Sequence, residues 1–240
     1  MVLIPPIVGI VQSSLTWGSA FFFLAWLCAY FLFYAATMYV RSRFKQRYFA
    51  PVLTYSVVTL AAGGLTLWFA PQLAWWAIVL APLVMFALWQ AYRRTERSLA
   101  SGIATTFTSS LALPMMWCVS VSKATMVDVP AAIWLVWALC CVYLVGTVFY
   151  VKTNVRKKGS RGYLAASIAV HTLGLAASVA AAFSYGGVGA WLTCVAWVCA
   201  LGRAVIIPLI GARGRRVPIP VIGVGEIVVS ILFLVAFVLY

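Results

Sequence analysis

Three ionisable residues of this 240-residue chain lie inside long apolar stretches: His171, Arg203 and Glu226. Near the centre of a bilayer, such a side chain costs about 2.5–3.5 kcal/mol or more, so it usually faces the interior of a helix bundle and has a partner. The neutral-range pKa typical of histidine suits a general base. The three residues therefore offer a base, a cation and an acid.

The three residues are expected to lie at similar depths in the membrane. Counted from the basic loop that bounds each stretch, all three lie on the order of 9–14 Å in, at about 1.5 Å per helical residue. Two arrangements remain open. In the first, His171, Arg203 and Glu226 form one polar cluster that lines a cavity open to the cytoplasm. In the second, Arg203 and Glu226 form an ion pair that only fixes helix packing, and His171 bonds a backbone carbonyl.

A second group of candidate residues lies in the densest polar segment, where Lys152, Asn154 and Arg156 follow an apolar stretch. Lys152 and Arg156 are four residues apart and would share one face of an α-helix. With Asn154 they could hold an anionic headgroup or a phosphate. The alternative is a stop-transfer anchor at the membrane interface, which needs no ligand.

The third group is Glu96 and Arg97, which lie beside Arg93 and Arg94. These residues predict an ion cluster at the membrane interface. The alternative is a role in holding a headgroup or phosphate at the membrane surface. None of the three groups identifies a catalytic residue.

The metal- and cofactor-binding residue types do not form a site. The six cysteines all lie in apolar stretches without a CxxC spacing, which is typical of small buried side chains. A single histidine cannot supply the two axial imidazoles of a b-type cytochrome. We therefore predict no metal site and no cofactor.

The composition is that of a membrane protein. The chain is 65% hydrophobic and 8% charged, with a mean hydropathy of +1.08, whereas soluble domains are about 45–50% apolar and about 25% charged. The formal net charge of +14 does not predict a nucleic-acid partner, because the cations border apolar stretches and no soluble domain presents them. Anionic lipid headgroups are the expected partners of these cations, and an unknown membrane-protein partner remains an alternative.

The basic residues predict the orientation. Fifteen of the seventeen Lys and Arg residues lie in four short stretches between every second pair of apolar runs: Arg41–Arg47, Arg93–Arg97, Lys152–Arg161 and Arg213–Arg216. The other connections are nearly bare, with Lys123 their one cation. By the positive-inside rule, we expect a multi-pass protein of the cell membrane with a cytoplasmic N-terminus and an external C-terminus.

Nine apolar elements follow from the hydropathy pattern, and they predict an all-α, polytopic transmembrane helix bundle that forms one domain over residues 1–240. The first element is short, because a helix needs about 20 residues to cross the hydrocarbon core. The expected elements are Val2–Ser13, Trp17–Val40, Pro51–Ala70, a fourth element that follows an external turn at Pro71-Gln72 and ends at Tyr92, Leu99–Val121, Ala131–Val151, Tyr163–Phe183, Val188–Ile210 and Pro220–Tyr240.

Three segments resemble the YwiC-like family of bacterial membrane proteins: Phe149–Arg156 (FYVKTNVR), Glu96–Leu99 (ERSL) and Gly223–Ile227 (GVGEI). Members of that family typically carry an Asn-Gln-His-Gly-Ala-Trp-like segment before the residues that match Met1–Pro6. The chain lacks this segment, so we expect a start upstream and a further His and Trp at the site. The resemblance implies no established biochemical activity.

The number of helices also resembles that of UbiA-type prenyltransferases, which are nine-helix bundles, and a UbiA-like architecture is therefore an alternative. Those enzymes hold Mg²⁺ with Asp-rich motifs, because hard cations bind several carboxylate oxygens. This chain has one aspartate, Asp128, in an expected external loop. Prenyl transfer by that mechanism is not predicted.

Three functions remain open at this stage. The first is a small-molecule transporter. The second is an intramembrane enzyme that acts on a lipid or isoprenoid, with His171 as base and Arg203, Lys152 and Arg156 on the anionic group. The third is a membrane assembly or accessory protein in which the polar residues are structural. The sequence does not decide between them, although it favours a protein that is not an enzyme.

Overall fold

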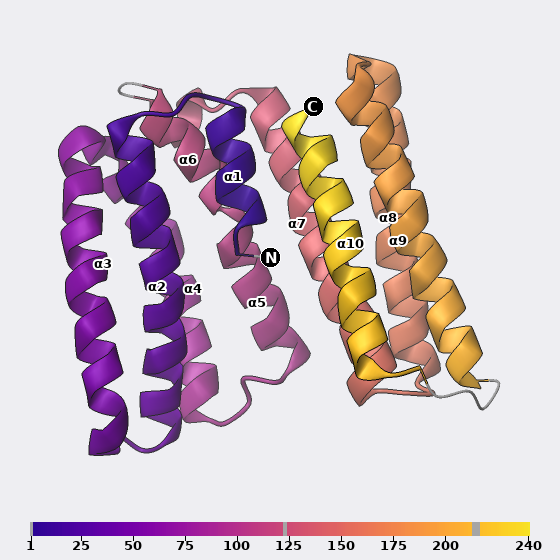
Figure 1. Ribbon diagram of the computed structural model, residues 1–240, viewed down its shortest axis with the longest axis horizontal. Coiled ribbons are helices and arrows are strands. Elements are labelled where there is room, and N and C mark those ends of the chain that lie inside the picture. Colours follow the sequence, from indigo (N-terminus) through magenta and orange to yellow (C-terminus); the bar gives the residue numbers. More distant parts are fainter. Residues whose placement is uncertain (1, 122–123, 213–216) are drawn as a thin grey trace. The chain divides into compact units, whose positions relative to one another are not determined.

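The computed structural model describes residues 2–121, 124–212 and 217–240 (Figure 1). All regular secondary structure in these ranges is helical, which confirms the all-α prediction. The chain divides into two compact units, Met1–Trp137 and Ala138–Tyr240, which are described separately below. The single domain expected over residues 1–240 stays a prediction. Lys123 and the basic stretch Arg213–Arg216 lie outside the described residues.

The N-terminal unit consists of helices joined by short connections, three of which contain 3₁₀ turns, and it includes the start of α7. Helices α2 and α3 pack along their length as a hairpin, and α2 also contacts α4 and α6. The helices are α1 (Ile4–Val11), α2 (Trp17–Arg41), α3 (Phe49–Phe69), α4 (Ala77–Tyr92), α5 (Leu99–Ser110), α6 (Ala112–Ser120) and α7 (Ala131–Val151).

The C-terminal unit consists of the rest of α7, a π-helical turn and three long helices. Helix α9 packs against both α8 and α10, and it therefore lies between them. The elements are η4 (Lys152–Arg156), α8 (Arg161–Tyr185), α9 (Val188–Ala212) and α10 (Ile219–Val238). The α8–α9 contact is close at Gly174, where a Cβ atom would lie 2.2 Å from the Trp197 ring.

Eight helical segments of the described residues are long and apolar enough to cross a membrane, and the chain is a multi-pass membrane protein. Large apolar side chains are exposed along these segments, Trp68 and Leu60 among them, as expected where lipid is the solvent. The segments are Trp17–Arg41, Gln46–Phe69, Pro71–Tyr92, Leu99–Ser120, Ala131–Arg156, Arg161–Tyr185, Val188–Gly211 and Ile219–Val238.

The short first element is confirmed as well. Helix α1 has eight residues, about 12 Å at 1.5 Å per residue, so it is too short to span. It packs against α6 at Gly9, where a Cβ would lie 2.7 Å from the carbonyl oxygen of Leu113. The predicted fifth helix is interrupted at Leu111, because Pro114 has no N–H to donate to the carbonyl of Ser110.

The ends of α2 and α4 are formed in the same way. The N–H of Phe44 donates to the carbonyl of Tyr39, and that of Thr95 donates to the carbonyl of Gln90. Both bonds close the last turn around residues with positive φ, which include Arg43 and Arg94. These turns bring the basic connections after α2 and α4 to one end of the N-terminal unit (Figure 1).

Candidate functional site

Arg203 of α9 and Glu226 of α10 form a two-pronged ion pair in the C-terminal unit. Nη1 of Arg203 lies 2.6 Å from Oε2 of Glu226, and Nη2 lies 3.0 Å from Oε1. Nη1 also donates to the carbonyl of Gly225 at 3.4 Å. The two side chains are 10% and 14% exposed. Parallel N–H···O bonds of this kind fix orientation as well as charge.

Two tyrosines of α7 complete the surroundings of this pair. The Arg203 guanidinium lies over the ring of Tyr150, with Cζ 4.5 Å from the ring centroid. The Tyr143 hydroxyl donates to Oε1 of Glu226 at 3.4 Å and bonds Oγ of Ser230 at 2.7 Å. Sequence reasoning missed these residues. The available signals were the i, i+7 spacing of the tyrosines and the i, i+4 spacing of Glu226 and Ser230, each placing two side chains on one helix face.

His171 of α8 is fully buried. Its Nδ1 lies 2.7 Å from the carbonyl oxygen of Ser167, so Nδ1 carries the proton. Nε2 is buried without a hydrogen-bond partner, and the ring meets the Trp197 ring edge to face at 6.0 Å. Within the described residues, the hydrogen bonds of Arg203 and Glu226 do not include His171. These contacts match the second arrangement above, and a shared cavity stays a prediction.

The predicted headgroup segment winds as a π-helix rather than an α-helix. Lys152 and Asn154 are buried, whereas Arg156 is exposed. Asn154 Nδ2 donates to the carbonyl of Tyr150 at 2.9 Å, which ties this turn to the tyrosine under Arg203. The α-helical spacing assumed for Lys152 and Arg156 therefore does not apply. A role of this segment in holding a headgroup stays a prediction, although π turns are frequent at functional sites.

Glu96 lies in the N-terminal unit, and its partner comes from a different basic connection than expected. Glu96 Oε1 lies 2.8 Å from Nη1 of Arg41, the last residue of α2. The side chains are 45% exposed for Arg41 and 24% exposed for Glu96, and Oε2 of Glu96 is buried without a hydrogen-bond partner. Arg97 is exposed.

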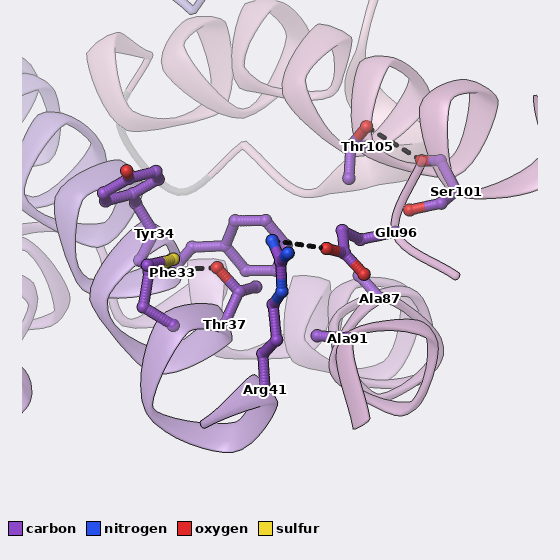
Figure 2. A pocket seen from close by; sticks show the side chains of 10 residues that line it. Phe33, Tyr34, Thr37, Arg41, Ala87, Ala91, Glu96, Ser101 and Thr105 are labelled. Carbon is purple, nitrogen blue, oxygen red and sulfur yellow. Dashed lines mark hydrogen bonds and ion pairs between the residues drawn. The ribbon is translucent and has the colours of Figure 1, made fainter. Parts of the chain in front are cut away.

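The Arg41–Glu96 ion pair borders a cavity of about 230 Å³, which we call the Arg41–Glu96 pocket (Figure 2). Helices α2, α4 and α5 form its walls. Its polar lining includes Tyr34, Thr37, Ser101 and Thr105 besides the ion pair. Its apolar lining includes Phe33, Met38, Ala87 and Ala91.

Asp128, the third acidic residue, lies in the connection before α7. Its Oδ2 accepts hydrogen bonds from the backbone N–H and the hydroxyl of Thr125, both at 2.7 Å. These bonds lower the pKa of Asp128 from its usual value of 3.8. In the described part of the chain, no three His, Cys, Asp or Glu side chains are placed to hold a metal ion.

The comparisons with known proteins also point to YwiC-like proteins, and the profile match includes one of the three segments that suggested the resemblance, Glu96–Leu99. The profile of the YwiC-like protein family matches residues 1–117. The uncharacterized protein YwiC of Bacillus subtilis (strain 168) is 25% identical over 174 residues, which cover 72% of this chain and 70% of that protein. The chain is therefore similar to the YwiC-like family, over residues 1–117 in the profile and over 174 residues in the Bacillus subtilis protein.

The family profile covers one of the two candidate sites. The matched range, residues 1–117, includes every residue that lines the Arg41–Glu96 pocket. Arg203 and Glu226 lie after this range. No solved structure matches the chain. The expected UbiA-like architecture therefore stays a prediction.

Proposed function

We propose that this YwiC-like protein moves a small solute across the bacterial cell membrane and that the Arg203–Glu226 ion pair belongs to the solute or ion path. The observation that carries the proposal is the position of this pair, on two adjacent helices that are otherwise apolar. Ionisable residues inside membrane helices commonly mark substrate and ion paths.

Stability alone does not explain the pair. Replacing a buried ion pair by apolar side chains of similar volume is often neutral or stabilising. Arg203 and Glu226 nevertheless stand among apolar residues, with a tyrosine ring and a tyrosine hydroxyl supplied by α7. Both side chains keep a small exposed fraction, so a small ion or solute could reach the edge of the pair.

The helices around the pair contain two places where their geometry can change. Helix α9 carries Pro208 in its interior, which removes one backbone hydrogen bond. Helix α7 ends at Val151, one residue after Tyr150, and continues into the π-helical turn, and π turns inside helices are common at functional sites. Alternating exposure of the pair would use these two elements.

The orientation proposed here follows from the charge pattern. The stretches Arg41–Arg47, Arg93–Arg97 and Lys152–Arg161 face the cytoplasm with Arg213–Arg216, so the N-terminus is cytoplasmic and the C-terminus external. The basic connections then contact the anionic headgroups of the inner leaflet. The protein has no nucleic-acid partner under this proposal.

A membrane accessory protein is the second candidate, and one observation favours it. Arg203 and Glu226 satisfy each other by two parallel hydrogen bonds, which is also what a purely structural pair would do. Such a protein would act through an unknown membrane partner. The enzyme candidate has less support, because His171 is fully enclosed and its Nδ1 proton is bonded to a backbone carbonyl.

The test compares the solutes inside and outside cells of a deletion strain and of strains that carry wild-type or variant protein at matched levels. We expect a solute whose uptake or efflux is lost on deletion and is not restored by Glu226→Gln or Arg203→Ala. Asp128→Asn is the matched control, since it removes the acid of the connection before α7, and it should restore flux. An unchanged solute profile on deletion would contradict transport, and co-purification of a membrane partner would then favour the accessory function.

A further inference from the structure

The Arg41–Glu96 pocket carries an inference about a ligand that the proposed function does not use. Arg41 and Glu96 point toward one another at one end of the pocket, and Ser101 and Thr105 of α5 lie across from Thr37 of α2 (Figure 2). All the lining residues belong to the N-terminal unit. The pocket is therefore independent of the Arg203–Glu226 ion pair.

Two hydroxyl groups and one carboxylate at this pocket are left with hydrogen-bond acceptors. The hydroxyl of Thr37 donates to the carbonyl of Tyr34, and that of Thr105 donates to the carbonyl of Ser101. Both hydroxyls keep only lone pairs for a ligand. Oε2 of Glu96 is a buried carboxylate oxygen without a partner, and leaving such a group unpaired is costly. A primary ammonium group supplies three N–H donors and the opposite charge.

The guanidinium of Arg41 would bind an anionic group at the other end of the ligand. One nitrogen of its guanidinium bonds Glu96, and the side chain is 45% exposed, so other N–H groups can reach an anion outside. A ligand with an ammonium on Glu96 and a phosphate on Arg41 would produce four alternating charges in sequence. A ligand with a single negative charge would leave Oε2 of Glu96 unpaired.

The position of the pocket indicates a lipid rather than a soluble molecule. The pocket runs along α2 from Arg41, at the level of the basic connections, to Phe33, about 12 Å deeper at 1.5 Å per residue. Its deeper walls are apolar and include the 64% exposed Tyr34. A cavity of 230 Å³ is below the roughly 300–1,000 Å³ typical of drug-sized ligands, so it suits a headgroup.

We propose that the Arg41–Glu96 pocket binds the ethanolamine headgroup of a phospholipid, with its ammonium on the carboxylate of Glu96 and its phosphate on the outer N–H groups of Arg41. The acyl chains leave along the apolar surface of α2 into the bilayer. The protein thereby distinguishes zwitterionic ethanolamine lipids from anionic lipids, which only the basic connections attract.

The experiment measures lipid binding to the purified full chain in detergent by native mass spectrometry. Phosphatidylethanolamine, phosphatidylcholine and phosphatidylglycerol with identical acyl chains are titrated separately. We expect phosphatidylethanolamine to bind tightest, because the trimethylammonium of phosphatidylcholine has no N–H and phosphatidylglycerol has no cation. Equal affinity for the three lipids, or no binding, would overturn the proposal.

Two variants locate the site. Glu96→Gln should weaken phosphatidylethanolamine binding about tenfold or more, as the loss of a charge-assisted hydrogen bond requires, and leave phosphatidylglycerol binding unchanged or tighter. Ala87→Leu fills the pocket without changing charge and should weaken phosphatidylethanolamine binding as well. Arg47→Gln is the control, since it removes a charge of the same basic stretch outside the pocket. Wild-type binding by both pocket variants would contradict the assignment.

A competition experiment distinguishes the phospholipid from a free, soluble headgroup molecule as the ligand. Free phosphoethanolamine carries the same charges without acyl chains. The proposal predicts that it displaces the lipid only at far higher concentration. Equal competition would show a site for a soluble zwitterion and would overturn the lipid assignment. Thermal unfolding of each variant confirms the fold, and the three-lipid comparison on wild-type protein decides the outcome even if Glu96→Gln is unstable.

Discussion

The two Arg–Glu ion pairs among the described residues have the same chemistry and different surroundings. Arg203 and Glu226 lie on spanning helices, bond by two contacts and have tyrosine neighbours. Arg41 and Glu96 lie at the end of α2 and in a connection, bond by one contact and leave Oε2 of Glu96 unpaired. Burial makes the first pair costly to break, whereas the second pair has a less buried arginine and a carboxylate oxygen without a hydrogen-bond partner.

The largest effect is expected from breaking the buried pair. Arg203→Met or Glu226→Leu alone leaves an uncompensated buried charge, which costs about 3–5 kcal/mol of unfolding free energy. The double variant Arg203→Met/Glu226→Leu should recover most of that loss. Chemical unfolding in detergent measures all three, and single variants that match the wild type would contradict the burial of the pair.

The next effect concerns the close packing of α8 and α9 in the C-terminal unit. Gly174→Ala places a Cβ 2.2 Å from the ring of Trp197, and we expect overpacking of about 1–3 kcal/mol. Tryptophan fluorescence and thermal unfolding should both change. Gly162→Ala in the same helix meets no atom within 4 Å and should not destabilise. Equal behaviour of the two variants would contradict the close approach.

A smaller effect is expected at the exposed pair. A double-mutant cycle with Arg41→Gln and Glu96→Gln should give a coupling energy of about 0.2–1 kcal/mol, since solvent and entropy weaken exposed pairs. The measurement is unfolding at low and high salt, with the coupling reduced at high salt. A coupling as large as that of Arg203 and Glu226 would remove the distinction drawn between the pairs.

The smallest effect belongs to Asp128, which is fully exposed. Hydrogen bonds from Thr125 hold its folded pKa below 3.8, so their contribution is present above that value and is lost as the pH falls through the lower, folded pKa. Because Asp128 is the single aspartate, ¹³C-aspartate labelling gives one carboxyl signal to titrate. Its midpoint should rise toward 3.8 in Thr125→Val, and an unchanged midpoint would show another cause.

Much of the fold could be predicted from the sequence, because apolar length and basic termini bound each spanning helix locally. The predicted Val188–Ile210 and Ala131–Val151 agree with α9 and α7 within two residues at each end. Pro114 inside the predicted Leu99–Val121 indicates a kink, and the structure interrupts this helix at Leu111. The winding of Lys152–Arg156 as a π-helix was missed, since nothing in the spacing distinguishes it from an α-helix.

The candidate sites were less predictable, because they depend on contacts between distant segments. Equal depth on adjacent helices was enough to suggest the Arg203–Glu226 pair. The partner of Glu96 was sought among its sequence neighbours, but it is Arg41, which the turns after α2 and α4 bring close. The tyrosines under and beside Arg203 look like ordinary apolar residues until α7 packs beside α9 and α10.

We propose that the buried Arg203–Glu226 pair serves transport rather than packing. The most direct test measures flux of the solute identified in the deletion strain through proteoliposomes that contain wild-type protein or the Arg203→Met/Glu226→Leu double variant. The account predicts that the double variant unfolds at a denaturant concentration close to that of the wild type and carries no flux. Flux at the wild-type rate through a folded double variant would contradict it.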